Sequence, residues 1–114
     1  MEDCIFCKII KGEIPSKKLY EDDKVIAFHD INPEAPIHFL VVPKEHIESV
    51  NALNEENSDI IAHIFKVINK LVKEEKIADS GYRIIINCGR DGGQTVNHIH
   101  FHVLGGKTLP MKLT

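Results

Sequence analysis

The sequence has no tryptophan, and aromatic residues make up only 6% of its 114 residues. It also has no apolar run near the ~20 residues that a membrane-spanning helix needs. Its first residues, Met1-Glu2-Asp3, are acidic, whereas a signal peptide begins with basic residues. We therefore expect no membrane segment and a cytoplasmic location.

Positive charge is not in excess either. Lys and Arg total 14 against 17 Asp and Glu, which gives a net charge of −3, and non-specific binding of polymeric nucleic acid needs a basic surface. Apolar residues still make up 43% of the chain, enough for a real core. We expect a single domain over residues 1–114 and no polymeric nucleic acid as a partner.

The chain has three cysteines, an odd number that fits a reducing compartment better than a disulfide framework. Apolar residues four apart within residues 4–12 predict a short helix, which Gly12 ends. Cys4 and Cys7 would project from one side of this helix, as two ligands of a tetrahedral zinc site do. Simple thiols are the alternative, and a redox pair fits less well, because no strand can precede residue 4.

Three histidines, His98, His100 and His102, occupy alternate positions near the C-terminus. This alternation predicts a strand over residues 97–104 with all three rings on one face. The core face would carry Ile99, Phe101 and Val103. At about 3.3 Å per residue the outer rings stand roughly 13 Å apart, too far to hold one metal ion together easily. Such a row can surround a small anion; a solvated face and a two-histidine metal clip are the alternatives.

The other apolar segments predict an antiparallel sheet. Residues 18–21 and 25–29 flank two aspartates and predict a hairpin. His38 opens a further strand over residues 39–42, which a proline ends. Residues 82–88 contain too many consecutive apolar residues for a half-exposed strand. We therefore expect this strand at the centre of the sheet.

The strongest helix signal follows Asn54, which we expect to be the N-cap. Acidic residues come next and lysines come late, as the helix dipole favours. One face carries Ile60, Ile61, Ile64, Ile68, Leu71 and Val72. We expect this face to pack on the sheet, with His63 as a boundary residue rather than a ligand.

Two loops lie next to expected strand ends. Asp30 begins a proline-stiffened loop, residues 30–36, where a carboxylate can face a ligand or form an Asx turn. The glycine-rich loop of residues 89–95 precedes the histidine row, and its backbone N–H groups can approach an anion closely. His46, considered alone, fits a surface histidine.

Together, these segments resemble the histidine triad (HIT) family, in particular its small nucleotide-binding branch that hydrolyses nucleoside phosphoramidates. The resemblance covers nearly the whole chain. Its motif is His98-Ile99-His100-Phe101-His102-Val103-Leu104, preceded by Asp91-Gly92-Gly93-Gln94-Thr95-Val96. Also similar are residues 4–10, residues 27–31, and residues 38–44 with His46.

The resemblance implies an α+β fold: an antiparallel sheet of about five strands with one long and one short helix, paired into a two-fold homodimer. By position, His100 matches the nucleophile and His102 the histidine that holds the phosphate, while His98 and His38 match the supporting pair. Asp30 matches the carboxylate that binds the ribose hydroxyls. The walls of the base pocket match Ile5, Phe6, Ile9, Phe28 and Ile31. Residues beside the phosphate match Asn87, Gly93 and Thr95.

In a subset of the family, Cys4, Cys7, His46 and His98 match a zinc site. A zinc ligand cannot reorient freely, so His98 would then position the site rather than transfer protons. The tail, Lys107-Thr108-Leu109-Pro110-Met111-Lys112-Leu113-Thr114, departs from the Trp-Pro-Pro-Gly-like ending of many relatives. The resemblance therefore does not carry over a leaving-group preference.

These features predict a hydrolase that cleaves purine nucleoside 5′-phosphoramidates, or related nucleoside monophosphate esters, at the α-phosphate. The reaction would pass through a nucleotidyl intermediate on His100, and the histidine row would replace the Mg²⁺ that phosphoryl chemistry usually needs. A nucleotide-binding adaptor with incidental turnover is the competing function. A zinc module without catalysis is a third reading, which would leave the histidine row idle.

Overall fold

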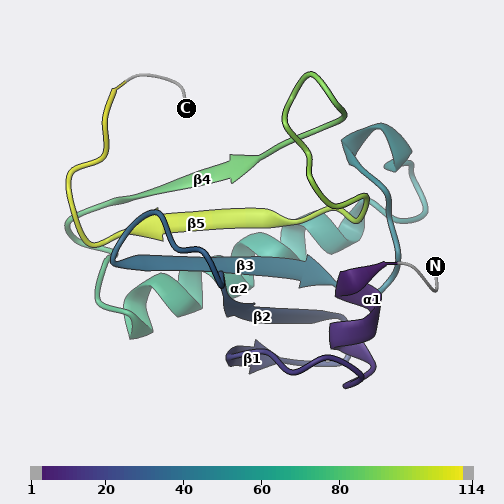
Figure 1. Cartoon of the computed structure of the whole chain (residues 1–114), viewed down its shortest axis with the longest axis horizontal. Helices are drawn as coiled ribbons and strands as arrows, with labels where there is room; N and C mark the ends of the chain where they lie inside the picture. Colours follow the sequence, from purple (N-terminus) through teal and green to yellow (C-terminus); the bar gives the residue numbers. More distant parts are fainter. Residues whose placement is uncertain (1–3, 112–114) are drawn as a thin grey trace.

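The computed structural model describes residues 4–111 and has an α+β fold (Figure 1). Its elements are α1 (Ile5–Ile10), β1 (Lys18–Glu21), β2 (Val25–His29), β3 (Ile37–Pro43), the short 3₁₀ helix η1 (Val50–Ala52), α2 (Asp59–Glu74), β4 (Tyr82–Ile86) and β5 (Phe101–Gly105). The five strands form one antiparallel sheet in the order β1-β2-β3-β5-β4. The expected fold class and the hairpin of residues 18–29 are confirmed.

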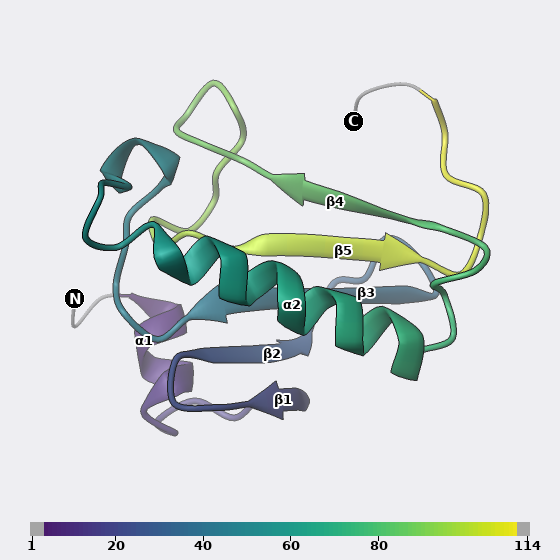
Figure 2. The ribbon, with the colours of Figure 1, turned by 180° about the vertical axis from the view of Figure 1, so that it is seen from behind.

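The two faces of the sheet carry different helices. The amphipathic helix α2 covers one face (Figure 2), where its apolar residues pack against alternate residues of the strands. That core includes Val25, Ala27, Phe39, Val41, Ile64, Val67, Ile68, Leu71, Val72, Ile99, Phe101 and Val103. The short helix α1 lies over one end of the opposite face (Figure 1), where a smaller core gathers Phe6, Ile26, Phe28, Leu40 and Val42. The site described below lies on this second face.

The histidine row lies only partly within a strand. The alternation is confirmed, because Ile99, Phe101 and Val103 lie in the α2 core. However, β5 begins at Phe101, so the expectation of a strand from residue 97 is wrong. The reason is local: before Phe101 the chain leaves the ladder, and the N–H of Ile99 donates instead to the carbonyl of Ile47 at 2.7 Å. His98 and His100 therefore sit on an irregular segment that leads into the strand.

The position expected for the strand of residues 82–88 is also wrong. β4 ends at Ile86 and lies at the edge of the sheet, paired only with β5, while β3 is the central strand. Its isoleucines are half-buried rather than buried. The run Ile84–Ile86 therefore lies on a strand whose outer edge pairs with no other strand among residues 4–111.

Asn54 does not cap α2. The helix begins five residues later at Asp59, with Ser58 as the N-cap residue. Asn54 instead caps the preceding turn, because its Oδ1 accepts the backbone N–H groups of Glu56 at 2.8 Å and Asn57 at 3.0 Å. The Asn54 side chain therefore stabilises a turn before the helix and not the N-terminus of the helix.

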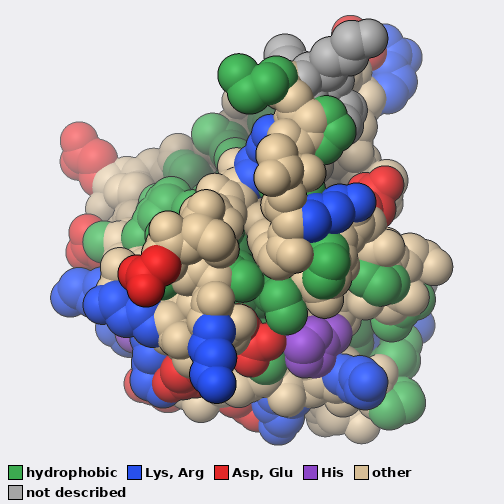
Figure 3. Space-filling model, turned by 90° about the vertical axis from the view of Figure 1, so that its left-hand side faces the viewer, with side chains coloured by type: hydrophobic (Ala, Val, Ile, Leu, Met, Phe, Trp, Pro, Cys, Tyr) green, Lys and Arg blue, Asp and Glu red, His purple; other side chains and the backbone are tan. Residues whose placement is uncertain are grey.

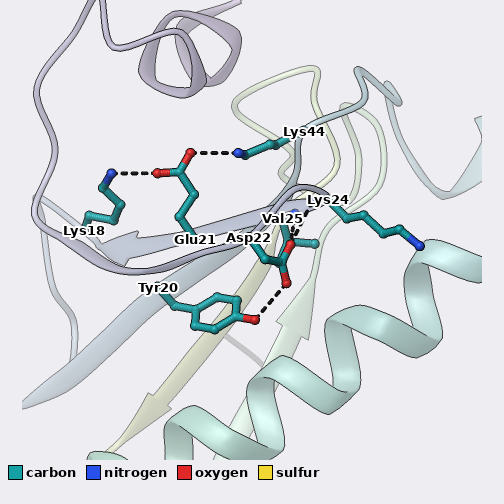
Figure 4. A network of polar contacts seen from close by, with 7 residues as sticks. All are labelled: Lys18, Tyr20, Glu21, Asp22, Lys24, Val25 and Lys44. Atoms are coloured by element: carbon teal, nitrogen blue, oxygen red, sulfur yellow. Dashed lines mark hydrogen bonds and ion pairs between the residues drawn. The ribbon is translucent and has the colours of Figure 1, made fainter.

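Asp22 ties the β1–β2 turn together and to α2. Its Oδ1 accepts the backbone N–H groups of Lys24 and Val25, and its Oδ2 accepts the Tyr20 hydroxyl, each at 2.8 Å (Figure 4). His63 of α2 lies 2.7 Å from the same Oδ2. His63 is half-buried at the edge of the apolar face, as expected of a boundary residue.

The surface carries both signs of charge. On the end of the molecule seen in Figure 3, Lys and Arg side chains lie interspersed with Asp and Glu. Within residues 4–111, no helix is long and apolar enough to cross a membrane.

Candidate functional site

Three histidine rings from two neighbouring strands meet on the α1 face. His38 comes from β3, and His100 and His102 come from the segment leading into and along β5. The ring centroids lie 5.3 Å apart for His38–His102 and 5.1 Å apart for His100–His102. His38 and His100 are each only 4% exposed, whereas His102 is half-buried. The antiparallel register therefore brings together residues that lie more than sixty positions apart.

His98 turns away from these three rings. Its Nε2 lies 2.8 Å from the carbonyl oxygen of Pro43, which can only accept, so Nε2 carries the proton. The unprotonated Nδ1 then points toward Cys4, Cys7 and His46. Burial, followed by the nearby His46 and His100, lowers the pKa of His98 to about 4. Of the residues assigned to the triad, His98 thus belongs to a separate cluster.

His100 is held in one tautomer. Its Nδ1 lies 2.7 Å from the carbonyl oxygen of His98, so Nδ1 donates and Nε2 keeps a free lone pair in the neutral ring. Burial lowers the pKa of His100 below its ordinary value, which favours the neutral form. The edge-to-face contact with Phe6, with centroids 5.0 Å apart, further restricts the ring. His100 can therefore act as a nucleophile through Nε2.

His38 sets the tautomer of His102 in the same way. The backbone N–H of Glu34 donates to His38 Nδ1 at 3.1 Å, so the proton of the neutral His38 ring sits on Nε2. That Nε2 lies 3.0 Å from His102 Nδ1 and donates to it, which leaves the His102 proton on Nε2. Burial, followed by the neighbouring His100 and His38, lowers the pKa of His102 to about 4. A neutral His102 thus offers an N–H donor suited to an anion.

The position of Asp30 is compatible with both roles considered from the sequence, an Asx turn and contact with a ligand. Its Oδ1 accepts the backbone N–H of Asn32 at 2.8 Å, which is the Asx turn. Its Oδ2 lies 3.4 Å from His38 Nε2 and 3.9 Å from His102 Nδ1. Each carboxylate oxygen accepts two hydrogen bonds, so Asp30 can still bind ligand hydroxyls. Asp30, His38 and His102 are a poor metal site, because the tautomer fixed by Glu34 places a proton on His38 Nε2.

Apolar residues flank this group on the α1 side. Phe6 and Phe28 are buried, with ring centroids 5.7 Å apart. Ile5 is 43% exposed and Ile31 is 88% exposed, and Ile9 is half-buried. Phe6 and Phe28 therefore form a floor, while the exposed isoleucines offer apolar surface that a ligand could cover.

The glycine-rich loop is braced by amide side chains. Asn87 Nδ2 donates to the Gly92 carbonyl at 2.8 Å. Gly93 adopts a left-handed φ of +80°, and its N–H already donates to the Arg90 carbonyl at 3.0 Å. Among residues 4–111 no acceptor takes the N–H of Thr95. Thr95, more than Gly93, can therefore offer a backbone donor to an anion.

Gln94 is a residue that the sequence patterns did not single out. Its Oε1 accepts the N–H of Gly89 at 2.9 Å, and its Nε2 donates to the carbonyls of Val96 at 2.9 Å and Glu48 at 2.7 Å. The Gln94 side chain thus links Gly89 to Val96 within the loop and links the loop to Glu48. No local pattern identifies such a role, because the partners lie up to 46 positions away.

Cys4, Cys7, His46 and His98 form a compact cluster whose ligand atoms all lie within 4.8 Å of one another. The distances are 3.3 Å for Cys4 Sγ–His98 Nδ1, 3.3 Å for Cys7 Sγ–His46 Nδ1 and 3.2 Å between the two Nδ1 atoms. Tetrahedral zinc at ordinary bond lengths requires about 3.6 Å between S and N and about 3.4 Å between N and N. Burial and the neighbouring Cys4 raise the pKa of the Cys7 thiol, so a thiolate there needs a cation. The residues fit a tetrahedral metal ion.

The chain thus combines an antiparallel sheet with a group of histidine rings on one face, and comparisons with known proteins identify its family. The family model described as "Scavenger mRNA decapping enzyme C-term binding" matches residues 3–113. The purine nucleoside phosphoramidase of Escherichia coli (strain K12) is 47% identical over 108 residues, which cover 95% of this chain and 91% of that protein.

Solved structures agree. A histidine triad protein from Clostridium difficile is 55% identical with a TM-score of 0.96, covering 99% of this chain and 98% of that one. A HIT family hydrolase from Clostridium thermocellum is 52% identical with a TM-score of 0.97, covering 100% of this chain and 99% of that one. The chain belongs to the histidine triad family.

Proposed function

We propose that this protein is a hydrolase that cleaves purine nucleoside 5′-phosphoramidates, or related nucleoside monophosphate esters, at the α-phosphate. The observation that carries the proposal is the orientation of His100, whose Nδ1 donates to the His98 carbonyl at 2.7 Å and leaves Nε2 free. The name of the E. coli relative, a purine nucleoside phosphoramidase, supports the substrate class.

The nucleotide would lie across the α1 face. The base would cover the exposed apolar surface of Ile5 and Ile31 above Phe6 and Phe28. The carboxylate of Asp30 would accept both ribose hydroxyls. The Nε2–H of His102 and the backbone N–H of Thr95 would hold the phosphate oxygens.

The reaction would proceed in two displacements. The Nε2 lone pair of His100 attacks phosphorus, and the P–N bond breaks as the departing nitrogen takes a proton that the Thr95 hydroxyl or the His102 ring relays from solvent water, so that neither side chain keeps a net charge. Water then attacks the same phosphorus, the bond to His100 Nε2 breaks, the proton released by that water returns to solvent, and the nucleoside monophosphate leaves. The lowered pKa values of His100 and His102 keep both rings neutral at physiological pH, as attack by His100 and hydrogen-bond donation by His102 to the phosphate require.

We further propose zinc as the metal held by Cys4, Cys7, His46 and His98. A structural zinc ion would cross-link the thiolate and imidazole ligands, and it would take no part in the reaction of the substrate. Because His98 provides the carbonyl that orients His100, a ligand bond at its Nδ1 would also steady the nucleophile. Cys4, Cys7 and Cys88 form no disulfide among residues 4–111, which supports the proposed cytoplasmic, reducing location.

A homodimer is part of the same proposal. The half-buried isoleucines of β4 lie on a free sheet edge, and such an edge invites pairing with another strand. Two copies related by a two-fold axis would bury the same apolar residues on both sides.

Turnover of adenosine and guanosine 5′-phosphoramidates tests the hydrolase proposal and compares the two bases. We expect saturable release of the monophosphate by the wild type and loss of nearly all activity in His100→Ala, with nucleotide binding retained. Tight nucleotide binding without turnover by the wild type would favour the adaptor function instead.

A further inference from the structure

The metal-ligand cluster of Cys4, Cys7, His46 and His98 can be reached by small molecules from one side. A cavity of about 330 Å³ lies against it, and Cys4 and His46 both belong to the lining of that cavity. These two residues are half-buried, whereas Cys7 and His98 are buried. A water molecule takes up about 30 Å³ in the liquid, so the cavity admits a molecule the size of hydrogen peroxide. Such a reagent meets Cys4 before it meets Cys7.

Cys4 and Cys7 lie close enough to form a disulfide with each other. The backbone N–H of Cys7 donates to Cys4 Sγ at 3.3 Å, so the sulfur of Cys4 lies against the backbone of Cys7. The two Sγ atoms belong to a group of ligand atoms that all lie within 4.8 Å of one another. A disulfide needs about 2.0 Å between the sulfurs, and cysteines three positions apart reach this distance in the Cys-x-x-Cys pairs of disulfide oxidoreductases.

Oxidation of both cysteines would leave the cluster with two imidazole ligands. A structural zinc site has four ligands, and a disulfide lacks the negative charge with which thiolates bind the cation. The metal ion would therefore be released. The ring of His98 would keep its hydrogen bond to the Pro43 carbonyl at 2.8 Å but lose its ligand bond at Nδ1. Because the His98 carbonyl accepts the Nδ1 proton of His100 at 2.7 Å, the nucleophile would then be less firmly oriented.

We propose that Cys4 and Cys7 are a peroxide-sensitive switch: their oxidation to a disulfide releases the metal ion and slows hydrolysis, and a dithiol with zinc restores both. This inference rests on the proposed zinc site and, for its effect on turnover, on the proposed hydrolase activity. The two cysteines act through His98 and touch no reacting atom of the substrate.

The oxidation transfers two electrons. The Cys4 thiolate attacks one oxygen of hydrogen peroxide, the O–O bond breaks, and hydroxide leaves a sulfenic acid on Cys4. The Cys7 thiolate then attacks the sulfur of Cys4, the S–S bond forms, and the second oxygen leaves as hydroxide. The two sulfurs lose two electrons, the peroxide gains them, and two protons from solvent complete two water molecules. A dithiol reverses the reaction by thiol–disulfide exchange and becomes a disulfide itself.

The test treats untagged, zinc-loaded protein with hydrogen peroxide in small molar excess. A chromogenic chelator measures zinc release, mass spectrometry of the peptide that contains Cys4 and Cys7 measures the disulfide, and release of AMP from adenosine 5′-phosphoramidate measures turnover. The matched control is Cys88→Ser, because Cys88 is a half-buried cysteine outside the metal-ligand cluster.

We expect the wild type and Cys88→Ser to respond alike. Zinc should leave as the Cys4–Cys7 disulfide forms, and turnover should fall by about tenfold, the size of effect that a change around a metal site produces. Dithiothreitol with zinc should restore the starting values. The switch would be overturned if both cysteines stayed reduced with zinc bound, if they were oxidised to sulfinic acids without a disulfide, or if Cys88→Ser no longer responded.

The three measurements separate this inference from the proposals on which it rests. Zinc release with unchanged turnover would overturn the link from His98 to His100. A wild type that holds no zinc would overturn the zinc proposal and the switch with it. A wild type that holds zinc but cleaves no phosphoramidate would overturn the hydrolase proposal, while zinc release and the disulfide would still decide whether Cys4 and Cys7 respond to peroxide.

Discussion

His102 should make the folded protein sensitive to mild acid. In the native state burial and the neighbouring rings hold its pKa at about 4, whereas the unfolded chain has an ordinary value of about 6.5. Because the folded-state pKa is the lower one, the unfolded state binds more protons between these two values. Stability therefore rises with pH across this window, and it is lost as the pH falls from about 6.5 toward 4.

The size of the effect follows from the two pKa values. Between pH 7 and pH 5, one such group removes about 2 kcal/mol from the free energy of unfolding. The side chain is 22% exposed, so solvent screens it little. In His102→Gln this contribution is absent, while the contribution of buried His98 remains in both proteins.

Urea unfolding at pH 7 and pH 5 measures the difference. We expect the wild type to lose about 2 kcal/mol more than His102→Gln over this interval. The control is the interval from pH 7 to pH 8, which lies above both pKa values, so that wild type and His102→Gln should there show nearly the same pH dependence. Equal pH dependence of wild type and His102→Gln would refute a neutral His102 in the folded protein, and with it the tautomer chain from Glu34.

Three further predictions follow from the site. By calorimetry, the wild type should bind AMP about fivefold more tightly than 2′-deoxy-AMP, because the deoxy form loses a hydrogen bond to the Asp30 carboxylate. Asp30→Asn should reduce this ratio. Equal affinities of the wild type for the two nucleotides would show that Asp30 does not bind the ribose. Elemental analysis of untagged protein should find about one zinc per chain, and the double change Cys4→Ser and Cys7→Ser should remove it. Less than half an equivalent of zinc in the wild type would contradict the zinc site and leave Cys4 and Cys7 as ordinary thiols. Sedimentation at micromolar concentration should show a dimer, and a monomer would count against pairing through β4.

The sequence predicted correctly which residues share a face of the sheet. It predicted less well where each strand lies within the sheet. The alternation of Ile99, Phe101 and Val103 with histidines correctly separated core from site, because side-chain alternation is a local property. The order of strands depends on long-range pairing, and a run such as Ile84–Ile86 can be equally apolar in a central strand or in an edge strand. That is why β4 was misplaced.

In the site too, the features that depend on long-range contacts could not be predicted from local patterns. His38 has no local signal, and only the pairing of β3 with β5 places it 3.0 Å from His102. The separation of His98 from the other rings depends on the Pro43 carbonyl, which accepts its Nε2 proton at 2.8 Å. Neither contact can be read from spacing, because each joins residues more than fifty positions apart. The resemblance to the HIT family supplied His38, and it matched His98 to the zinc site, where periodicity could do neither.

The central claim is that Nε2 of His100 forms a covalent bond to phosphorus. A single-turnover reaction with adenosine 5′-phosphoramidate, quenched rapidly and examined by mass spectrometry, tests it directly. We predict a nucleotidyl adduct on the peptide that contains His100 in the wild type, and neither adduct nor appreciable turnover in His100→Ala. The account would be contradicted if His100→Ala kept turnover within about threefold of the wild type, a barrier change under ~1 kcal/mol, or if the adduct mapped to another residue.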